Sequence, residues 1–198
     1  MTGMGRTGKP FAMQHWGVEP DIILIGKGVA SGYAPLGGVL ASAHVVEAIG
    51  GGSGAFMHGF TYQAHPVSTA AGNAVLDYLE ANKLFERVNT AGKNLREVLS
   101  RLEKHPHVGD IRGMGLLLGV EFVKDKATRE PFAKSENIAE KIRQAAVTEG
   151  VLTYPTQGCV DGHRGDHILL APPFTISEDE CAVAGNAVSS ALAKVFPS

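Results

Sequence analysis

A short apolar run that ends near a lysine is the feature that most limits how this chain can fold. Residues 22–25 are Ile-Ile-Leu-Ile, a run that is too short for a helix and rich in isoleucine, so it predicts a buried strand. Lys27 follows this run and opens a glycine-rich stretch, residues 28–38, which predicts a tight, open turn. We expect an amine in this position to be poorly solvated, and burial favours the neutral amine that attacks a carbonyl. Lys27 is therefore a candidate Schiff-base lysine, and the alternative is an ordinary lysine that ends a strand and points to water.

Signals for strands and helices alternate along the chain. The expected strands are residues 21–26, 37–43, 108–111, 116–123, 151–154 and 167–170. The expected helices are residues 43–49, 66–80, 84–103, 136–149 and 178–195. Ser135 is the expected N-cap of the fourth helix, and Ser177 with Glu180 predicts a capping box at the start of the fifth.

Composition and charge exclude several classes of function. With 198 residues, of which 44% are apolar and 19% charged, the chain is expected to fold around one large core or two small ones. The formal net charge of -2 gives no reason to expect nucleic acid or an acidic membrane as a partner. No apolar run reaches membrane-spanning length. Cys159 and Cys181 do not make a disulfide framework in a chain of this length, so a reducing cytoplasm is the simplest expectation.

The eight histidines raise the question of a metal site, but their spacing argues against one. His163 and His167 are four residues apart, yet Gly165 between them is unfavourable for the helix that such a pair needs. No CxxC motif accompanies the histidines. We therefore expect no metal site.

Several motifs occur in a fixed order along the chain. They are Gly5-Arg6-Thr7-Gly8, His15-Trp16-Gly17-Val18-Glu19-Pro20-Asp21, Gly26-Lys27-Gly28, His58-Gly59-Phe60-Thr61-Tyr62, Gly113-Met114-Gly115-Leu116 and Leu170-Ala171-Pro172-Pro173-Phe174. Together they closely resemble the class III aminotransferases, which are pyridoxal-phosphate enzymes of fold type I. The resemblance covers essentially the whole chain, and several motifs in register are far more specific than any one of them.

The resemblance implies an α/β fold and a division into domains. Residues 1–82 would be the C-terminal part of the large cofactor-binding domain, and residues 83–198 would be a small C-terminal α+β domain. The family's aspartate that binds the pyridine nitrogen of the cofactor would lie three residues before Met1, so we expect the chain to lack the N-terminal half of the enzyme. A truncated chain, a wrongly assigned start or a separate companion chain would each account for this.

The resemblance also implies roles for individual residues. Lys27 would bind pyridoxal 5′-phosphate covalently and then act as the general base that moves a proton from the substrate carbon. Thr61, with the backbone of Phe60, would reach the phosphate of the neighbouring subunit's cofactor, which implies a homodimer; the alternative is an ordinary helix-entry threonine. Arg164 is a candidate for binding a substrate carboxylate, and a solvated loop arginine is an equally good interpretation. Many members that use glutamate or ornithine carry an arginine at the position of Leu169 instead.

The expected function is transfer of an amino group from an amino acid or amine to a keto acid, with these small molecules as partners. One alternative is a pyridoxal-phosphate-dependent mutase or decarboxylase of the same fold. Another is a non-catalytic fragment or subunit that needs an N-terminal partner. The sequence does not identify the amino donor or acceptor.

Overall fold

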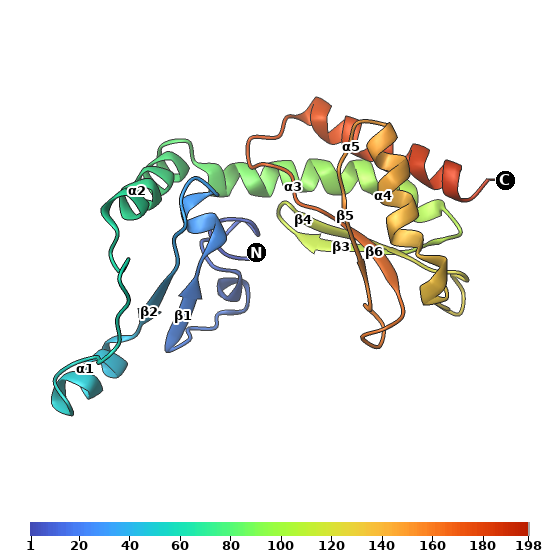
Figure 1. Cartoon of the computed structure of the whole chain (residues 1–198). Coiled ribbons are helices and arrows are strands. Elements are labelled where there is room, and N and C mark those ends of the chain that lie inside the picture. Colours follow the sequence, from blue (N-terminus) through green and yellow to red (C-terminus); the bar gives the residue numbers. More distant parts are fainter. Residues whose placement is uncertain (198) are drawn as a thin grey trace. The chain divides into compact units, whose positions relative to one another are not determined.

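The computed structural model describes residues 1–197, and its helices and strands form a mixed α/β structure (Figure 1). The chain divides into two compact units. Residues 1–5 and 9–85 form unit 1, whereas residues 6–8 and the chain from residue 86 onward form unit 2. The domain boundary expected at residue 82 stays a prediction, because compactness alone does not identify a unit with a domain of a family.

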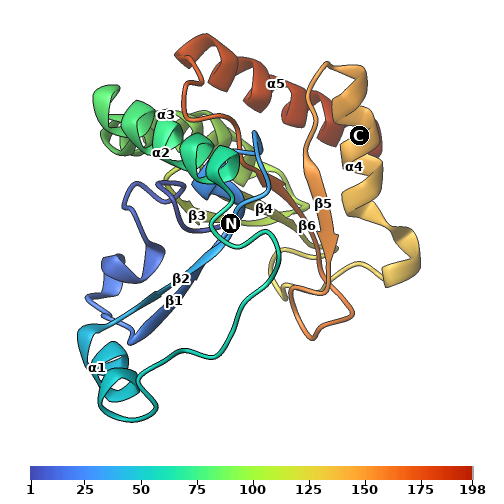
Figure 2. The same ribbon diagram turned by 60° about the vertical axis from the view of Figure 1, so that its left-hand side comes forward.

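Unit 1 contains a two-stranded sheet and two helices. β1 (Ile22–Ile25) pairs antiparallel with β2 (Gly38–Ala41), and Figure 2 shows the two strands side by side. α1 (Ala43–Gly51) follows β2 directly, and α2 (Pro66–Ala81) begins with a proline in its first turn, as expected. Both strands and both helices therefore lie where the sequence predicts them.

The predicted burial of β1 is wrong. Ile22 is 52% exposed and Leu24 is 78% exposed, whereas Ile23 and Ile25 are partly buried. Apolar periodicity identifies a strand, but it does not say what covers the faces of that strand. Among residues 1–197, β2 is the only strand that pairs with β1.

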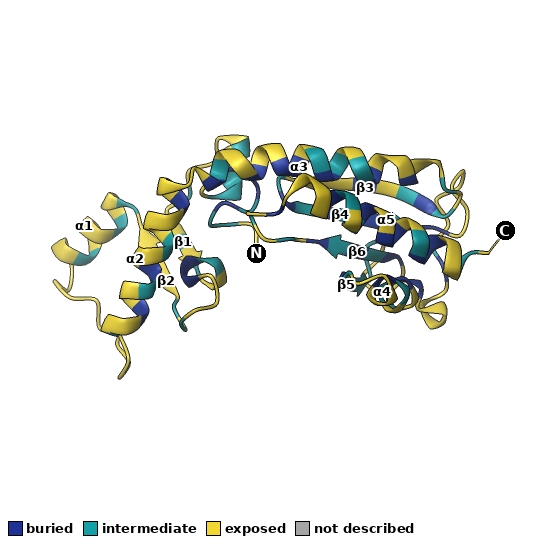
Figure 3. Cartoon of the chain, turned by 90° about the horizontal axis from the view of Figure 1, so that it is seen from above, coloured by how far each residue is buried: buried dark blue, intermediate teal, exposed yellow. Residues whose placement is uncertain are grey.

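Unit 2 is built on a four-stranded antiparallel sheet with the strand order β3-β4-β6-β5. The strands are β3 (Val108–Met114), β4 (Leu117–Phe122), β5 (Tyr154–Gln157) and β6 (Asp166–Leu170). Buried and less buried residues alternate along β4 and β6, so one face of the sheet is apolar. Three helices contribute to the core on that face: α3 (Leu84–Ser100), α4 (Ile138–Thr148) and α5 (Glu178–Val195). Figure 3 shows buried residues along these helices and strands.

α4 begins later than the sequence predicts, and Ser135 does not cap it. Ser135 lies in a 3₁₀ turn, and the N-cap residue of α4 is Asn137, whose side chain makes no capping bond. The cap comes from β6, where Asp166 Oδ1 accepts a hydrogen bond from the backbone N–H of Ala139 at 2.9 Å. Asp166 is 0% exposed, so a buried carboxylate that is distant in sequence satisfies the start of this helix.

α5 begins as predicted. The Ser177 hydroxyl accepts a hydrogen bond from the backbone N–H of Glu180 at 3.2 Å, and the Glu180 carboxylate accepts one from the N–H of Ser177 at 2.8 Å. The capping box is confirmed because both partners are local in the sequence. Val183 of this helix is 54% exposed, whereas Val188 and Leu192 are buried.

β5 is displaced from its predicted position. We predicted residues 151–154, and the strand occupies Tyr154–Gln157. Pairing with β6 sets this register, with Pro155 opposite Ile168. A proline is tolerated there because β5 is an edge strand of the sheet.

Arg6 joins three of the sequence motifs within unit 2. Its guanidinium donates to the carbonyl oxygens of Leu116 at 3.1 Å and Pro172 at 2.5 Å. It also lies 4.6 Å from the centre of the Phe174 ring, a cation–π contact. Gly115 has φ of 56°, and a Cβ there would lie 2.7 Å from the carbonyl oxygen of Arg6. Burial lowers the pKa of Arg6, and these contacts give its motif a structural role.

Candidate functional site

Lys27 lies two residues beyond the end of β1, at the first residue of a 3₁₀ turn (Lys27–Ala30) that Gly26 precedes. Its φ is 51°, in the left-handed region that residues other than glycine rarely adopt. The residue is exposed, so the predicted burial of its amine is wrong. Within residues 1–197, the ammonium group of Lys27 makes no hydrogen bond or ion pair.

Packing of the turn against α2 fixes the backbone of Lys27. Val29 and Ala30 are 6% and 0% exposed. α2 comes close to the turn at Gly72, where a Cβ would lie 2.6 Å from the Leu36 side chain and 3.6 Å from the carbonyl oxygen of Val29. The turn thus holds the backbone of Lys27 in place while its side chain faces solvent. This geometry suits reaction of the Lys27 amine with an aldehyde once another protein surface displaces water from the amine.

Phe60 and Thr61 lie in the loop between α1 and α2, and both are exposed. The carbonyl oxygen of Phe60 accepts a hydrogen bond from the N–H of Gln63 at 3.0 Å, which closes a turn around Thr61. The Thr61 hydroxyl has no hydrogen-bond partner in the described part of the chain. The structure places both residues in the same unit as Lys27, and among residues 1–197 no hydrogen bond or ring contact joins them to it.

Arg164 lies in unit 2, in the loop between β5 and β6. Its Nε donates to Asp161 Oδ2 at 2.8 Å, and its backbone N–H donates to Asp161 Oδ1 at 2.7 Å. The backbone N–H of His163 donates to the same oxygen at 2.9 Å. The backbone N–H of Arg164, followed by its guanidinium, holds the pKa of Asp161 well below its usual range. A substrate carboxylate at Arg164 would therefore have to replace Asp161 as the partner of the guanidinium.

Sequence reasoning missed Asp161, although a signal for it was present. An aspartate followed by glycine is typical of a turn in which the carboxylate binds backbone N–H groups two and three residues later. Asp161 and Gly162 match that pattern. The pattern predicts the backbone bonds but not the ion pair with Arg164.

A second group of charged side chains lies on the solvent-facing side of the sheet in unit 2. The guanidinium of Arg112 donates to Asp110 at 2.9 Å and to Glu121. The hydrogen bond that Arg112 donates to Glu121, followed by the one that it donates to Asp110, raises the pKa of Arg112. Burial raises the pKa of the nearby Cys159 thiol, which favours the less reactive protonated form. One guanidinium in this group is paired with two carboxylates, and we assign the group no chemical role.

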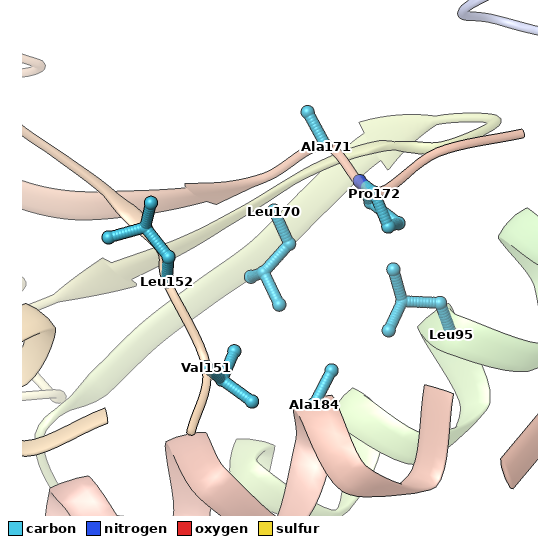
Figure 4. A pocket seen from close by; sticks show the side chains of 7 residues that line it. All are labelled: Leu95, Val151, Leu152, Leu170, Ala171, Pro172 and Ala184. Atoms are coloured by element: carbon cyan, nitrogen blue, oxygen red, sulfur yellow. The ribbon is translucent and has the colours of Figure 1, made fainter. Parts of the chain in front are cut away.

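A small hollow in unit 2 has an apolar lining and a volume of about 110 Å³ (Figure 4). It is lined by Leu95, Val151, Leu152, Leu170, Ala171, Pro172 and Ala184. None of these side chains can donate a proton or bind a charged group. The hollow is therefore no candidate for the reaction centre.

Nowhere in the described part of the chain do three His, Cys, Asp or Glu side chains gather into a group that could hold a metal ion. None of the helices formed by residues 1–197 has the length and apolar character needed to cross a membrane.

The comparisons with known proteins agree on one family. The family described as "Aminotransferase class-III" matches residues 1–192. YodT of Bacillus subtilis (strain 168), an uncharacterized aminotransferase, is 40% identical over 181 residues, which are 91% of this chain and 41% of the relative.

Solved structures agree with this match. An (S)-enantioselective omega-transaminase from Thermomicrobium roseum is 42% identical with a TM-score of 0.87, over 98% of this chain and 42% of that one. A PLP-bound amine transaminase from an uncultivated Pseudomonas species is 36% identical with a TM-score of 0.89, over 98% of this chain and 43% of that one. The chain therefore spans about two-fifths of the length of the proteins that it matches.

Proposed function

Because the chain belongs to the class III aminotransferase family, we propose that it carries the lysine-bearing part of a pyridoxal-phosphate-dependent transaminase. The reaction moves an amino group from an amino acid or amine to a keto acid. Lys27 is the observation that carries the proposal. It combines an amine without an ion pair, a rigid turn and an unusual backbone conformation, and such conformations cluster at functional sites.

The residues of unit 1 suit pyridoxal phosphate by their chemistry. The amine of Lys27 is the group that binds the cofactor's aldehyde, and the Thr61 hydroxyl with the backbone of Phe60 is suited to the phosphate. When bound, pyridoxal phosphate supplies an electron sink for the negative charge that develops at the substrate carbon. Lys27 accepts the proton from that carbon, and Arg164 orients a substrate carboxylate after leaving Asp161.

The family also suggests how the two units belong to a longer protein. We assign residues 1–82 to the C-terminal part of the large domain of fold type I, and residues 83–198 to a small C-terminal α+β domain. A homodimer follows if Thr61 serves the cofactor of the neighbouring subunit. Because Cys159 and Cys181 are both free thiols, we place the protein in a reducing compartment, the cytoplasm.

A transamination assay tests this proposal. The chain is mixed with pyridoxal phosphate, an amine donor and pyruvate, alone and together with the unmatched part of YodT, and alanine formation is measured. We expect alanine from the combined proteins and none after Lys27→Ala. Lys83→Ala is the matched control, because Lys83 is also an exposed lysine of unit 1 with a positive φ, 48°. Equal loss of activity in the two variants would remove Lys27 from its assigned role.

A further inference from the structure

Lys27 needs support from its neighbours, because its backbone conformation costs free energy. Its φ of 51° lies in the left-handed region, where the Cβ of a residue comes too close to the following carbonyl oxygen. Such a conformation persists only where the surrounding structure holds it. α2 approaches the turn at Val29, two residues beyond Lys27, so the residues next to Lys27 need a closer support.

Met4 contacts the residue that directly follows Lys27. A Cβ built on Gly28 would lie 3.0 Å from Cβ of Met4 and 3.4 Å from its Cγ. Carbon atoms attract one another at about 3.5–4.0 Å, so a side chain at residue 28 would displace Met4 or the turn. The φ of Gly28 is not positive, so conformational freedom does not explain why a glycine stands there. The close approach of the Met4 side chain explains it.

The Met4 side chain is half-buried and is itself held within unit 1. Met4 has φ of 53°, so it is a second residue with a side chain in the left-handed region. Gly5 after it is buried and has φ of 94°. A Cβ built on Gly3 before it would lie 3.9 Å from the ring of Phe11, which is ordinary packing contact. Met4 therefore lies on a turn whose position is fixed by its own packing.

We propose that Met4 is a positioning residue for Lys27, and that contact of its side chain with Gly28 keeps the backbone of Lys27 in the left-handed conformation. The purpose of this contact rests on the proposed function, because a misplacement of about 1 Å at a reacting group can cost about 100-fold in rate. Without the contact, the backbone of Lys27 is free to adopt a negative φ, which a residue with a side chain favours by about tenfold.

Two substitutions and a matched control test the contact. Met4→Gly removes the side chain and keeps the turn, because glycine adopts a positive φ without strain. Gly28→Ala introduces the Cβ that would meet Met4. Ser31→Gly is the control, because Ser31 is an exposed residue with φ of 46° at the end of the same 3₁₀ turn. It undergoes the same change from a left-handed residue to glycine without touching the contact.

NMR of the chain measures the backbone of Lys27 directly. A positive φ brings the amide proton of a residue close to its own Hα, and this gives a strong cross-peak between the two protons. We expect the cross-peak of Lys27 in the unchanged chain and in Ser31→Gly, and a fall of about tenfold in the left-handed population in Met4→Gly. Circular dichroism shows whether each variant folds. Met4→Ala, which should give a smaller fall, replaces Met4→Gly if that variant does not.

Transamination measures the consequence for the reaction. In the chain assembled with the unmatched part of YodT, we expect Met4→Gly and Gly28→Ala each to lower kcat for alanine formation by about tenfold. The KM for pyruvate should stay within about twofold, because Met4 acts on the lysine and not on substrate binding. Since both substitutions act through one contact, the double variant should lose no more than the weaker of the two single variants.

Three results would overturn the proposal. The first is an unchanged cross-peak of Lys27 in Met4→Gly. The second is an equal loss of kcat in Ser31→Gly, and the third is a double variant in which the two single losses multiply. A lack of alanine from the unchanged assembly would instead refute the proposed function, and the NMR measurement then decides for or against the contact between Met4 and Gly28.

Discussion

Replacing Asp166 is expected to lower the free energy of unfolding of unit 2, because Asp166 caps α4. Asp166→Ala removes the acceptor of the Ala139 N–H, and both residues are buried. The capped Ala139 N–H is then an unsatisfied buried donor, which costs about 1–3 kcal/mol. Gln157 also loses a bond to Asp166, but its amide still donates to the carbonyl oxygen of Lys134. We therefore expect a loss of about 1–3 kcal/mol in the free energy of unfolding.

Asp166→Asn separates the hydrogen bond from the charge. Its amide oxygen can still accept from Ala139, so the cap is kept. Its amide nitrogen takes the place of Asp166 Oδ2, which is buried and makes no hydrogen bond within the described residues, so the variant carries an unpaired donor that costs about 1–3 kcal/mol. Urea unfolding followed by circular dichroism measures the free energy, and amide exchange at the start of α4 gives a local measure. Asp179→Ala is the control, because Asp179 is an exposed acid in the first turn of α5, which Ser177 caps. The reasoning is refuted if Asp166→Ala changes stability no more than Asp179→Ala does, or if the Ala139 amide exchanges as fast in the Asn variant as in the Ala variant.

Three further predictions concern unit 2. Ser177→Ala should lower the unfolding free energy by about 1 kcal/mol in urea, because it removes the capping hydroxyl; an unchanged midpoint would contradict the role of the cap. Gly92→Ala should lower the melting temperature markedly, since a Cβ there would collide with the backbone of Gly115; a melting temperature equal to that of the unchanged protein would contradict this packing. Burial lowers the pKa of His105, whose Nδ1 accepts a hydrogen bond from the N–H of His107. The unfolded chain then binds a proton at higher pH than the folded chain, so this stability is present above pH 6.5 and is lost as the pH falls through the folded pKa. An NMR titration of His105 with a midpoint at or above 6.5 would contradict the assignment.

Features whose partners are close in sequence could be predicted. The Ser177 box and the proline at the start of α2 depend on residues within one helical turn, and both are present. The N-cap of α4 could not be found in this way, because Asp166 lies 27 residues beyond Ala139 and meets it only through the sheet. The register of β5 was likewise set by its pairing with β6 rather than by local apolar pattern.

Prediction of the candidate site from the sequence is limited even more strongly by contacts between residues that are distant in the sequence. The sequence placed Lys27 at the end of a strand and before a turn, and the structure has it there. The exposure of its amine could not be read from an apolar run, because burial depends on what packs against the strand from elsewhere. Arg164 was found as a loop arginine, but its ion pair depends on how the loop folds back on Asp161. Roles for Phe60 and Thr61 stay predictions that rest on the family.

The most direct test of the central claim is to trap the cofactor on the protein. The chain, assembled with the unmatched part of YodT, is incubated with pyridoxal phosphate and reduced with borohydride, and the modified lysines are then located by mass spectrometry. Our account predicts that Lys27 carries nearly all of the pyridoxyl group at a cofactor concentration that leaves Lys83 unmodified. Equal labelling of the two lysines, or labelling that is absent from Lys27, would contradict it.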